Sequence, residues 1–201
     1  MLAQVVAHRS AGEVVVVNID EATVAQLDPQ RMAGYSAQLL DSLSEASSVA
    51  LDLPLLPGLD YSALQAGMRA YPHTLLVVPS VAEDATGGSN LMLPQALSAL
   101  AAARSHRVIT MGHYGVVTGF VPYRVSAGVT YGSISLDALR VAGIEPRLPI
   151  SNFMQPYALS ISDERTQAVM TMLPRAMNLQ QYSYIDVLHQ RVPKDTFAGK
   201  V

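Results

Sequence analysis

Short runs of aliphatic residues alternate with stretches of helical periodicity along the first half of the chain. Residues 14–19 begin with four valines and suit a strand that is buried on both faces. Residues 36–46 carry an apolar stripe at helical spacing, and residues 49–53 again have the composition of a strand. This alternation is typical of βαβ units. It predicts an α/β fold with a mostly parallel central sheet flanked by helices.

The same alternation continues through the middle of the chain. We expect a third strand at residues 74–81 and a fourth at residues 107–111. Between them, residues 94–104 are rich in alanine, the best helix former, and Pro94 suits the first turn of a helix. Each strand is thus again separated from the next by a helix, as a parallel sheet requires.

After the fourth strand the pattern changes. Residues 115–125 and 128–135 are both strand-like and close in sequence, which favours an antiparallel hairpin extension of the sheet. A helix is expected to end at Gly143, and Ser183 is expected to cap a late helix. No internal repeat or linker interrupts the chain, so we expect residues 1–201 to form one domain.

Composition limits the classes of function. Half of the residues are hydrophobic and 14% are charged, which is typical of a globular protein. The net charge of −3 and the lack of a basic stripe argue against nucleic-acid binding. The chain has no cysteine, which excludes disulfides, thiolate metal sites and a cysteine nucleophile.

The sequence lacks the common catalytic motifs of α/β proteins. We find no dinucleotide-binding G-x-G-x-x-G after the first strand, no Walker A motif and no G-x-S-x-G. The five histidines are scattered and none belongs to an H-E-x-x-H pair. We therefore expect no catalytic residue, no metal and no cofactor in this chain.

Polar side chains instead follow the predicted strands. Ligands of open parallel sheets bind beyond the carboxyl ends of the strands. Asp20 is expected to be structural, capping the helix that follows the first strand by accepting its N–H groups. The residues expected to bind a ligand at this rim are Glu21, Asp52, His113, Tyr114 and Arg124.

Other interpretations of these residues remain open. Asp52 can equally pair with an arginine or with nearby backbone. Clustered acids need a compensating charge, which could be Arg124, Arg31, a bound cation or an amine-bearing ligand. In an alternative function, Asp20 and Asp52 would hold Mg²⁺ in a small hydrolase or phosphotransferase. A third possible function is that of a purely structural interaction module.

Three stretches of the chain carry a family resemblance. The first is VVVVNIDEATVAQL, a strand that ends in an acidic pair before a helix. The second is YSAQLLDSLSEASSVALDLPLL, a helix and strand containing an aspartate, and the third is the closing segment YSYIDVLHQRVPKDTFAGKV. In these stretches the chain resembles the second CHASE family, the extracytoplasmic sensory domains attached to cyclases and histidine kinases.

This resemblance implies a sensor domain that is periplasmic or extracellular in an inner-membrane receptor. Its partners would be an unknown small-molecule or protein signal, the membrane helices of the parent receptor and, in a homodimer, a second copy of the chain. The output domain would be a diguanylate cyclase, a histidine kinase or an adenylate cyclase. The family's closing segment leads into a final strand, so we expect this chain to be truncated at its C-terminus before that strand.

Overall fold

The computed structural model describes the backbone of residues 14–53, 58–78, 94–107, 109–111, 117–120, 123–126, 129–145, 154–156, 167–170 and 179–201. Side chains are described in the same ranges, apart from residues 109–111, 117–120, 124–126, 154–156 and 167–170. Within these ranges the helices are α1 (Glu21–Gln26), α2 (Met32–Ser42), α3 (Ser62–Ala70), α4 (Gln95–Ser98), α5 (Ile134–Val141) and α6 (Tyr184–Leu188). The strands are β1 (Val15–Asn18), β2 (Val49–Leu51), β3 (Thr74–Val77), β4 (Ala103–His106), β5 (Ile109–Met111), β6 (Val117–Phe120), β7 (Tyr123–Ser126), β8 (Val129–Ser133), β9 (Met154–Pro156), β10 (Gln167–Met170) and β11 (Gln180–Ser183).

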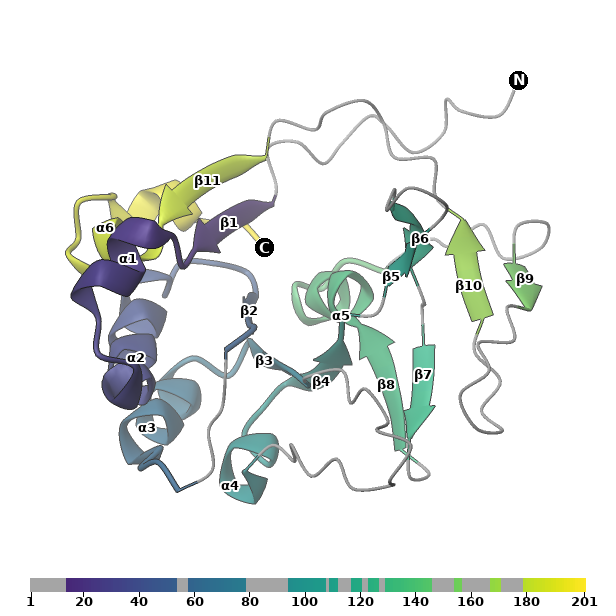
Figure 1. Cartoon of the computed structure of the whole chain (residues 1–201), viewed down its shortest axis with the longest axis horizontal. Helices are drawn as coiled ribbons and strands as arrows, with labels where there is room; N and C mark the ends of the chain where they lie inside the picture. The colour runs from purple at the N-terminus through teal and green to yellow at the C-terminus, as the bar shows by residue number, and fades with distance from the viewer. Residues whose placement is uncertain are drawn as a thin grey trace.

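The central sheet has five strands in the order β2-β3-β4-β8-β7 (Figure 1). The first four are parallel to one another, and β7 is antiparallel to β8 at the edge. The α/β class with a mostly parallel central sheet is therefore confirmed. Of the two strands expected over residues 115–135, the first is divided into β6 and β7, and β6 belongs to another sheet.

The first strand is not a member of this sheet. β1 pairs in parallel with β11, more than 160 residues later, in a two-stranded sheet. The strands β5, β6, β10 and β9 form a third, antiparallel sheet. The prediction that the first two strands end side by side at one rim is therefore wrong for the described strands. Valine-rich sequence specifies that a strand forms, but not which distant strand it pairs with.

The alanine-rich helix is shorter than predicted, and the fourth parallel strand begins earlier. Helix α4 ends at Ser98, and the backbone N–H of Ala102 donates to the carbonyl of Thr74 at 2.8 Å. Pairing with β3 thus continues directly into β4, which covers residues assigned to the helix on propensity alone. The segment predicted as the fourth strand contains β5, which is antiparallel to β6. Tertiary pairing here overrides the helix preference of alanine.

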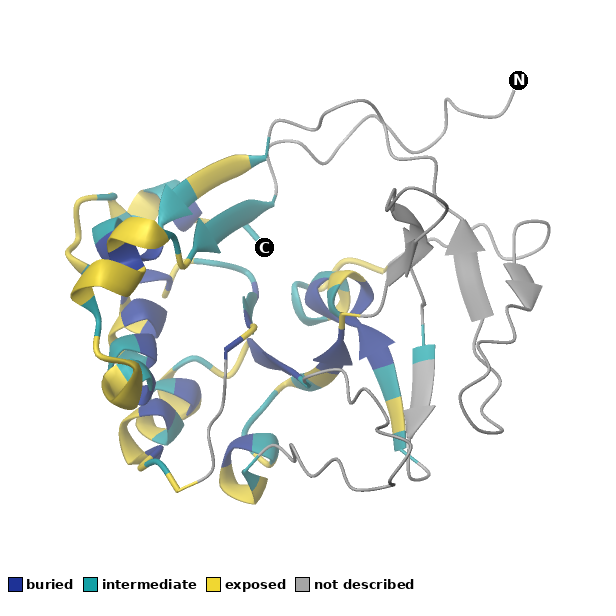
Figure 2. Ribbon diagram, in the orientation of Figure 1, coloured by how far each residue is buried: buried dark blue, intermediate teal, exposed yellow. Residues whose placement is uncertain are grey.

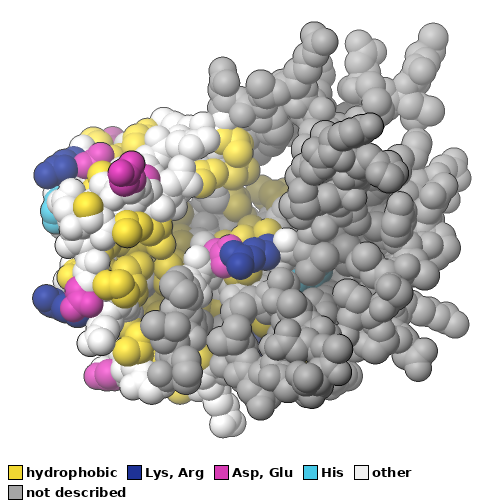
Figure 3. All heavy atoms as spheres, in the orientation of Figure 1, with side chains coloured by type: hydrophobic (Ala, Val, Ile, Leu, Met, Phe, Trp, Pro, Cys, Tyr) yellow, Lys and Arg dark blue, Asp and Glu magenta, His cyan; other side chains and the backbone are white. Residues whose placement is uncertain are grey.

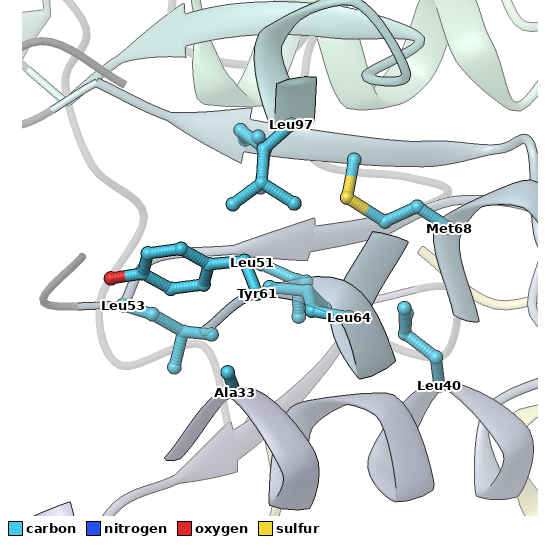
Figure 4. Packing of buried hydrophobic residues seen from close by; sticks show 9 residues of the cluster. Ala33, Leu40, Leu51, Leu53, Tyr61, Leu64, Met68 and Leu97 are labelled. Carbon is cyan, nitrogen blue, oxygen red and sulfur yellow. The ribbon is translucent and has the colours of Figure 1, made fainter. Parts of the chain in front are cut away.

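One face of the central sheet is covered by α2, α3 and α4. Leu40 and Leu64 are fully buried between the two long helices, and Gly67 allows them to approach closely, because a Cβ there would lie 3.3 Å from Ala37 Cα. In Figure 4, Leu97 of α4 points toward Met68 and the ring of Tyr61. The buried members of this cluster are Ala33, Leu40, Leu51, Leu53, Tyr61, Leu64, Met68, Leu76 and Leu97.

Helix α5 packs against β2, β3 and β4. All four residues of β3 are buried, so this strand is covered on both faces, and Figure 2 shows it in dark blue between partly exposed helices. The hydroxyl of Ser48 donates to the carbonyl of Ala138 at 2.9 Å, which ties α5 to the segment before β2. In the part of the chain that the structure describes, no helix is long and apolar enough to cross a membrane.

A second core joins β1 and β11 to the rest of the domain. Its buried members are Leu39, Leu43, Tyr184, Val187 and Phe197. The Tyr184 hydroxyl lies 3.3 Å from the buried hydroxyl of Ser36, and burial raises the pKa of Tyr184 to about 12, so this phenol stays neutral. This core places the closing segment of the chain against α2 and the opening strand.

Candidate ligand pocket

A pocket of about 610 Å³ lies where β4 begins, between α4 and α5. We call it the α4–α5 pocket. Its apolar lining is provided by alanines at positions 99 and 101–103. Gln95 and Ser98 contribute polar groups from α4, and Thr130 contributes a hydroxyl from β8. The lining thus combines small apolar groups with hydrogen-bonding side chains.

A buried carboxylate forms part of the pocket wall. Ser105 donates a hydrogen bond to Asp137 Oδ2 at 2.8 Å, and Arg140 Nη1 lies 3.5 Å from Asp137 Oδ1. The carboxylate packs directly against Gly132, where an added Cβ would lie 2.2 Å from Asp137 Oδ1. Because Gly132 has no side chain, β8 leaves the space that this charge occupies.

Arg140 forms another part of the pocket wall and is held by an aromatic residue. Arg140 donates through Nη2 to the Tyr123 hydroxyl, and its Cζ lies 5.4 Å from the centroid of the Tyr123 ring. The bond to Tyr123 raises the pKa of Arg140; burial acts in the opposite direction, and the charges of Asp137 and Glu145 add to the increase. The guanidinium therefore stays charged at any physiological pH.

Another arginine lines the pocket from β4. Arg104 Nη1 donates to the Ser98 hydroxyl at 3.3 Å, and its Cζ lies 5.7 Å from the centroid of the Tyr131 ring. The two partners are neutral, whereas Arg140 contacts an acid. Arg104 and Tyr131 directly precede Ser105 and Gly132, which are partners in the parallel pairing of β4 and β8, so the guanidinium and the ring lie side by side.

A family model described as CHASE2 domain matches residues 1–201. This chain belongs to the CHASE2 family. No curated protein and no solved structure matches it. The match confirms the family resemblance found in the sequence. CHASE2 domains are extracytoplasmic sensory domains of signalling receptors and are not catalytic.

At the carboxyl ends of the central strands of this CHASE2 domain, Asp52 forms an ion pair. Its Oδ2 lies 2.6 Å from Nη1 of Arg107, which follows β4, so the pair spans the end of β3. Both side chains are substantially exposed, 39% for Asp52 and 55% for Arg107. Among the side chains that Figure 3 draws in colour, each Lys or Arg group lies beside an acidic one. The charge that compensates Asp52 is therefore Arg107, which the sequence analysis did not name.

The other residues predicted at the rim are not brought to this pair by the described structure. Glu21 begins α1 and follows β1, which lies in a different sheet from β2. Arg31 stacks on the ring of Tyr35, with Cζ 5.5 Å from its centroid. Only the backbone of Arg124 is described, in β7, and His113 and Tyr114 lie outside the described residues. Ligand binding by these residues stays a prediction.

Asp20 links two helix starts. Its Oδ1 accepts hydrogen bonds from the backbone N–H and the hydroxyl of Thr23, at 2.9 and 2.7 Å, and so caps α1. The buried Thr23 hydroxyl in turn accepts from the backbone N–H of Ile185 in α6, at 3.3 Å. Asp20 and Asp52 thus serve separate structural contacts. Among the residues that the structure describes, no group of three His, Asp or Glu side chains could hold a metal ion.

Replacing Asp20 by alanine is expected to lower the melting temperature by about 2–4 °C, as the loss of a helix cap does in a domain of this size. The hydrogen bonds from Thr23 lower the pKa of Asp20. The stability that Asp20 contributes is therefore fully present above the titration range of an ordinary carboxyl group, and it is lost as the pH falls through the lowered pKa of Asp20. Thermal unfolding across this pH range would measure both effects.

Glu21→Ala is the matched control for this prediction, because it leaves both bonds from Thr23 in place. An equal loss of stability in the two variants, or a loss in Asp20→Ala that persists at low pH, would show that the cap is not the cause.

The sequence analysis missed the residues that form the α4–α5 pocket. A signal was available in the i, i+3 spacing of Asp137 and Arg140, but such pairs are common on exposed helix faces. The burial of Asp137 depends on Gly132 and Ser105, which lie on two strands that pair only in the folded chain.

Proposed function

We propose that this CHASE2 domain is the input domain of a membrane-bound receptor, that it recognises a small molecule in the α4–α5 pocket, and that it passes the signal to a cytoplasmic output domain such as a diguanylate cyclase or a histidine kinase. The family match over the whole chain supports the sensory role. In the receptor, the domain is periplasmic or extracellular and is connected to membrane helices. The α4–α5 pocket, with alanine methyl groups beside several hydrogen-bonding side chains, is the observation that supports a small molecule as the signal.

A continuous set of contacts supports transmission from the pocket to the closing segment at residues 194–201. Asp137 lines the pocket on α5, and the next residue, Ala138, accepts the hydrogen bond from Ser48. The backbone N–H of Ser47 donates to the carbonyl of Lys200 at 2.7 Å. A ligand that shifts α5 would therefore act on the closing segment through two hydrogen bonds and adjacent backbone.

Filling the pocket should abolish the response of the receptor while leaving the domain folded. Ala99 is exposed and lines the pocket at the end of α4, so Ala99→Phe places a ring in the space for the ligand. Exposed substitutions of this kind usually change stability by less than about 0.5 kcal/mol. The measurement is the output activity of the full-length receptor in cells, with and without the inducing signal.

Ala96→Phe is the matched control, because Ala96 is exposed on the same helix and does not line the pocket. We expect it to retain the wild-type response. A receptor that responds normally with Ala99→Phe, at unchanged expression and melting temperature, would show that this pocket is not where the signal is recognised.

A further inference from the structure

We propose that residues 99–104 form a helix–strand switch: in a minor state of the domain, α4 continues through Ala103 and β4 begins only at Ser105. The described structure is the major state, in which Ala102 bonds to β3 and Ala103 begins β4. The equilibrium itself does not depend on the proposed function. Its use in signalling rests on that function, because the switch residues line the α4–α5 pocket.

The sequence of residues 99–104 contains no signal that ends a helix. It is ALAAAR, which has neither glycine nor proline and consists of strong helix formers. Ala99, the C-terminal cap of α4, still has helical backbone angles, with φ −73° and ψ −20°. The N–H groups of Leu100 and Ala101 still donate to the carbonyl of Leu97, at 3.0 and 3.1 Å. Helical hydrogen bonding thus continues past the last residue of α4 as far as Ala101.

A change of hydrogen-bond partner at the next residue ends this helical bonding. The N–H of Ala102 donates to the carbonyl of Thr74 in β3 at 2.8 Å, where a continued α-helix would direct it to the carbonyl of Ser98. One backbone bond would replace another of the same kind, so this exchange by itself changes the free energy little. Alanine favours helices and is depleted in strands, so the intrinsic preference of the segment opposes the observed pairing.

The residues that would change conformation lie outside the core. None of residues 98–104 is buried, whereas Leu97 before them and Ser105 after them are fully buried. Lengthening the helix therefore removes little apolar surface from the core. Each residue that passes from strand to helix shortens the chain by about 1.8 Å. Because both ends of the segment are anchored, this shortening strains the packing of α4, which keeps the state with the longer helix minor.

The switch residues also form a wall of the α4–α5 pocket. Ala99 and residues 101–104 line it, together with Gln95 and Ser98 of α4. When the helix lengthens, these residues move and the shape of the pocket changes. A ligand that fits the described shape therefore binds the described state more tightly and shifts the equilibrium away from the longer helix.

The bond that the switch breaks belongs to the amino end of the central sheet. Thr74, which accepts it, directly follows His73, and the carbonyl of His73 accepts from the N–H of Val49 in β2 at 3.1 Å. Two residues earlier, the N–H of Ser47 donates to the carbonyl of Lys200. The start of β3 thus connects the switch to the closing segment through backbone hydrogen bonds.

Relaxation-dispersion and saturation-transfer NMR of the 201-residue chain, without any ligand, tests the proposal. Motions of this kind fall in the microsecond-to-millisecond range that these methods detect. We expect residues 99–104 to exchange with a minor state populated at roughly 0.1–10%. In that state the Cα chemical shifts of Ala101, Ala102 and Ala103 should be displaced toward helical values, whereas simple fraying of β4 would displace them toward those of an unfolded chain.

Ala102→Val is the decisive variant, because Ala102 is exposed and a β-branched residue disfavours helix and favours strand. We expect it to lower the population of the minor state about threefold or more. Ala96→Val is the matched control: Ala96 is equally exposed and lies in α4, which is helical in both states, so the population should stay as in the wild type. In the full-length receptor without signal, Ala102→Val should change the output in the same direction as the signal does, since both favour the described state.

The switch is overturned if residues 99–104 show no exchange, if their minor state has the shifts of an unfolded chain, or if Ala102→Val and Ala96→Val change its population equally. These results leave the proposed function intact, provided that Ala99→Phe still abolishes the response of the receptor. Conversely, a helical minor state in a receptor that responds normally with Ala99→Phe supports the switch and overturns the proposed function. An unchanged output of the Ala102→Val receptor would overturn the role of the switch in signalling.

Discussion

Replacing Gly132 by alanine is expected to destabilise the domain by roughly 2–4 kcal/mol, which is the combined cost of overpacking and of displacing a buried hydrogen-bonded group. The added Cβ would lie 2.2 Å from Asp137 Oδ1 and 2.5 Å from its Cγ, so the carboxylate must move. Any movement away from β8 breaks the 2.8 Å bond from Ser105, which is fully buried. Urea unfolding of the two proteins measures the difference in free energy of unfolding.

Two further variants identify the cause. Gly34 lies in α2 with no atom near the place of an added Cβ, so Gly34→Ala should stabilise the domain by about 0.5–1 kcal/mol. In an Asp137→Ala background the clash is absent, and Gly132→Ala should then cost little or nothing. A destabilisation that is the same in both backgrounds would show that contact with Asp137 is not the reason for the glycine.

Extending the chain beyond Val201 with the residues that follow it in the full-length protein is expected to raise the free energy of unfolding. Such a strand would pair two open strand edges and bury apolar side chains, at about 1.5–3 kcal/mol for each one fully buried, and we expect these gains to exceed the cost of ordering its backbone, about 1–2 kcal/mol per residue. The physical argument lies in the position of the closing residues, next to two strands of different sheets.

Lys200 and Val201 bridge β1 and the segment before β2. The N–H of Val15 donates to the carbonyl of Val201 at 3.0 Å, and the N–H of Ser47 donates to the carbonyl of Lys200 at 2.7 Å. Figure 1 shows this end of the chain between β1 and β2. In the described structure, β1 pairs with β11 and β2 with β3, so each has an edge facing this position. We propose that a strand continuing from Val201 fills it and joins the two sheets.

Thermal and urea unfolding of the extended and unextended chains would measure this effect. The control is an extension of equal length made of glycine and serine, which can occupy the same space but has no apolar side chains to bury, and we expect it to leave the unfolding midpoint almost unchanged. A native extension that behaves like this control would contradict the proposed strand.

The α/β class could be predicted from the sequence because its signals are local. The aliphatic run at Val49–Leu51 and the apolar stripe of α2 each reflect burial of one element, whatever its neighbours are. The cap at Asp20 is equally local, since the donors from Thr23 are three residues away. The helix predicted over the alanine-rich segment before β4 is too long, because there the local preference for helix conflicts with pairing to β3.

The partners of the charged residues could not be predicted. Asp52 was correctly singled out as an acid that needs compensation, but its partner, Arg107, lies 55 residues away at the end of a strand that had been placed too late. The pocket depends on the same kind of information. Arg104 is adjacent to Tyr131, and Asp137 is adjacent to Ser105, only because β4 pairs with β8.

The sequence by itself determined that this chain forms alternating strands and helices, that α1 begins at an acidic cap, and that the protein belongs to the CHASE2 family. Tertiary structure alone decided that β1 pairs with β11, and that the carboxylate of Asp137 and the guanidinium of Arg140 line one pocket beside Gly132. The physical reason is the range of the interactions. Burial and capping act within a few residues, whereas strand order brings together side chains that no local pattern connects.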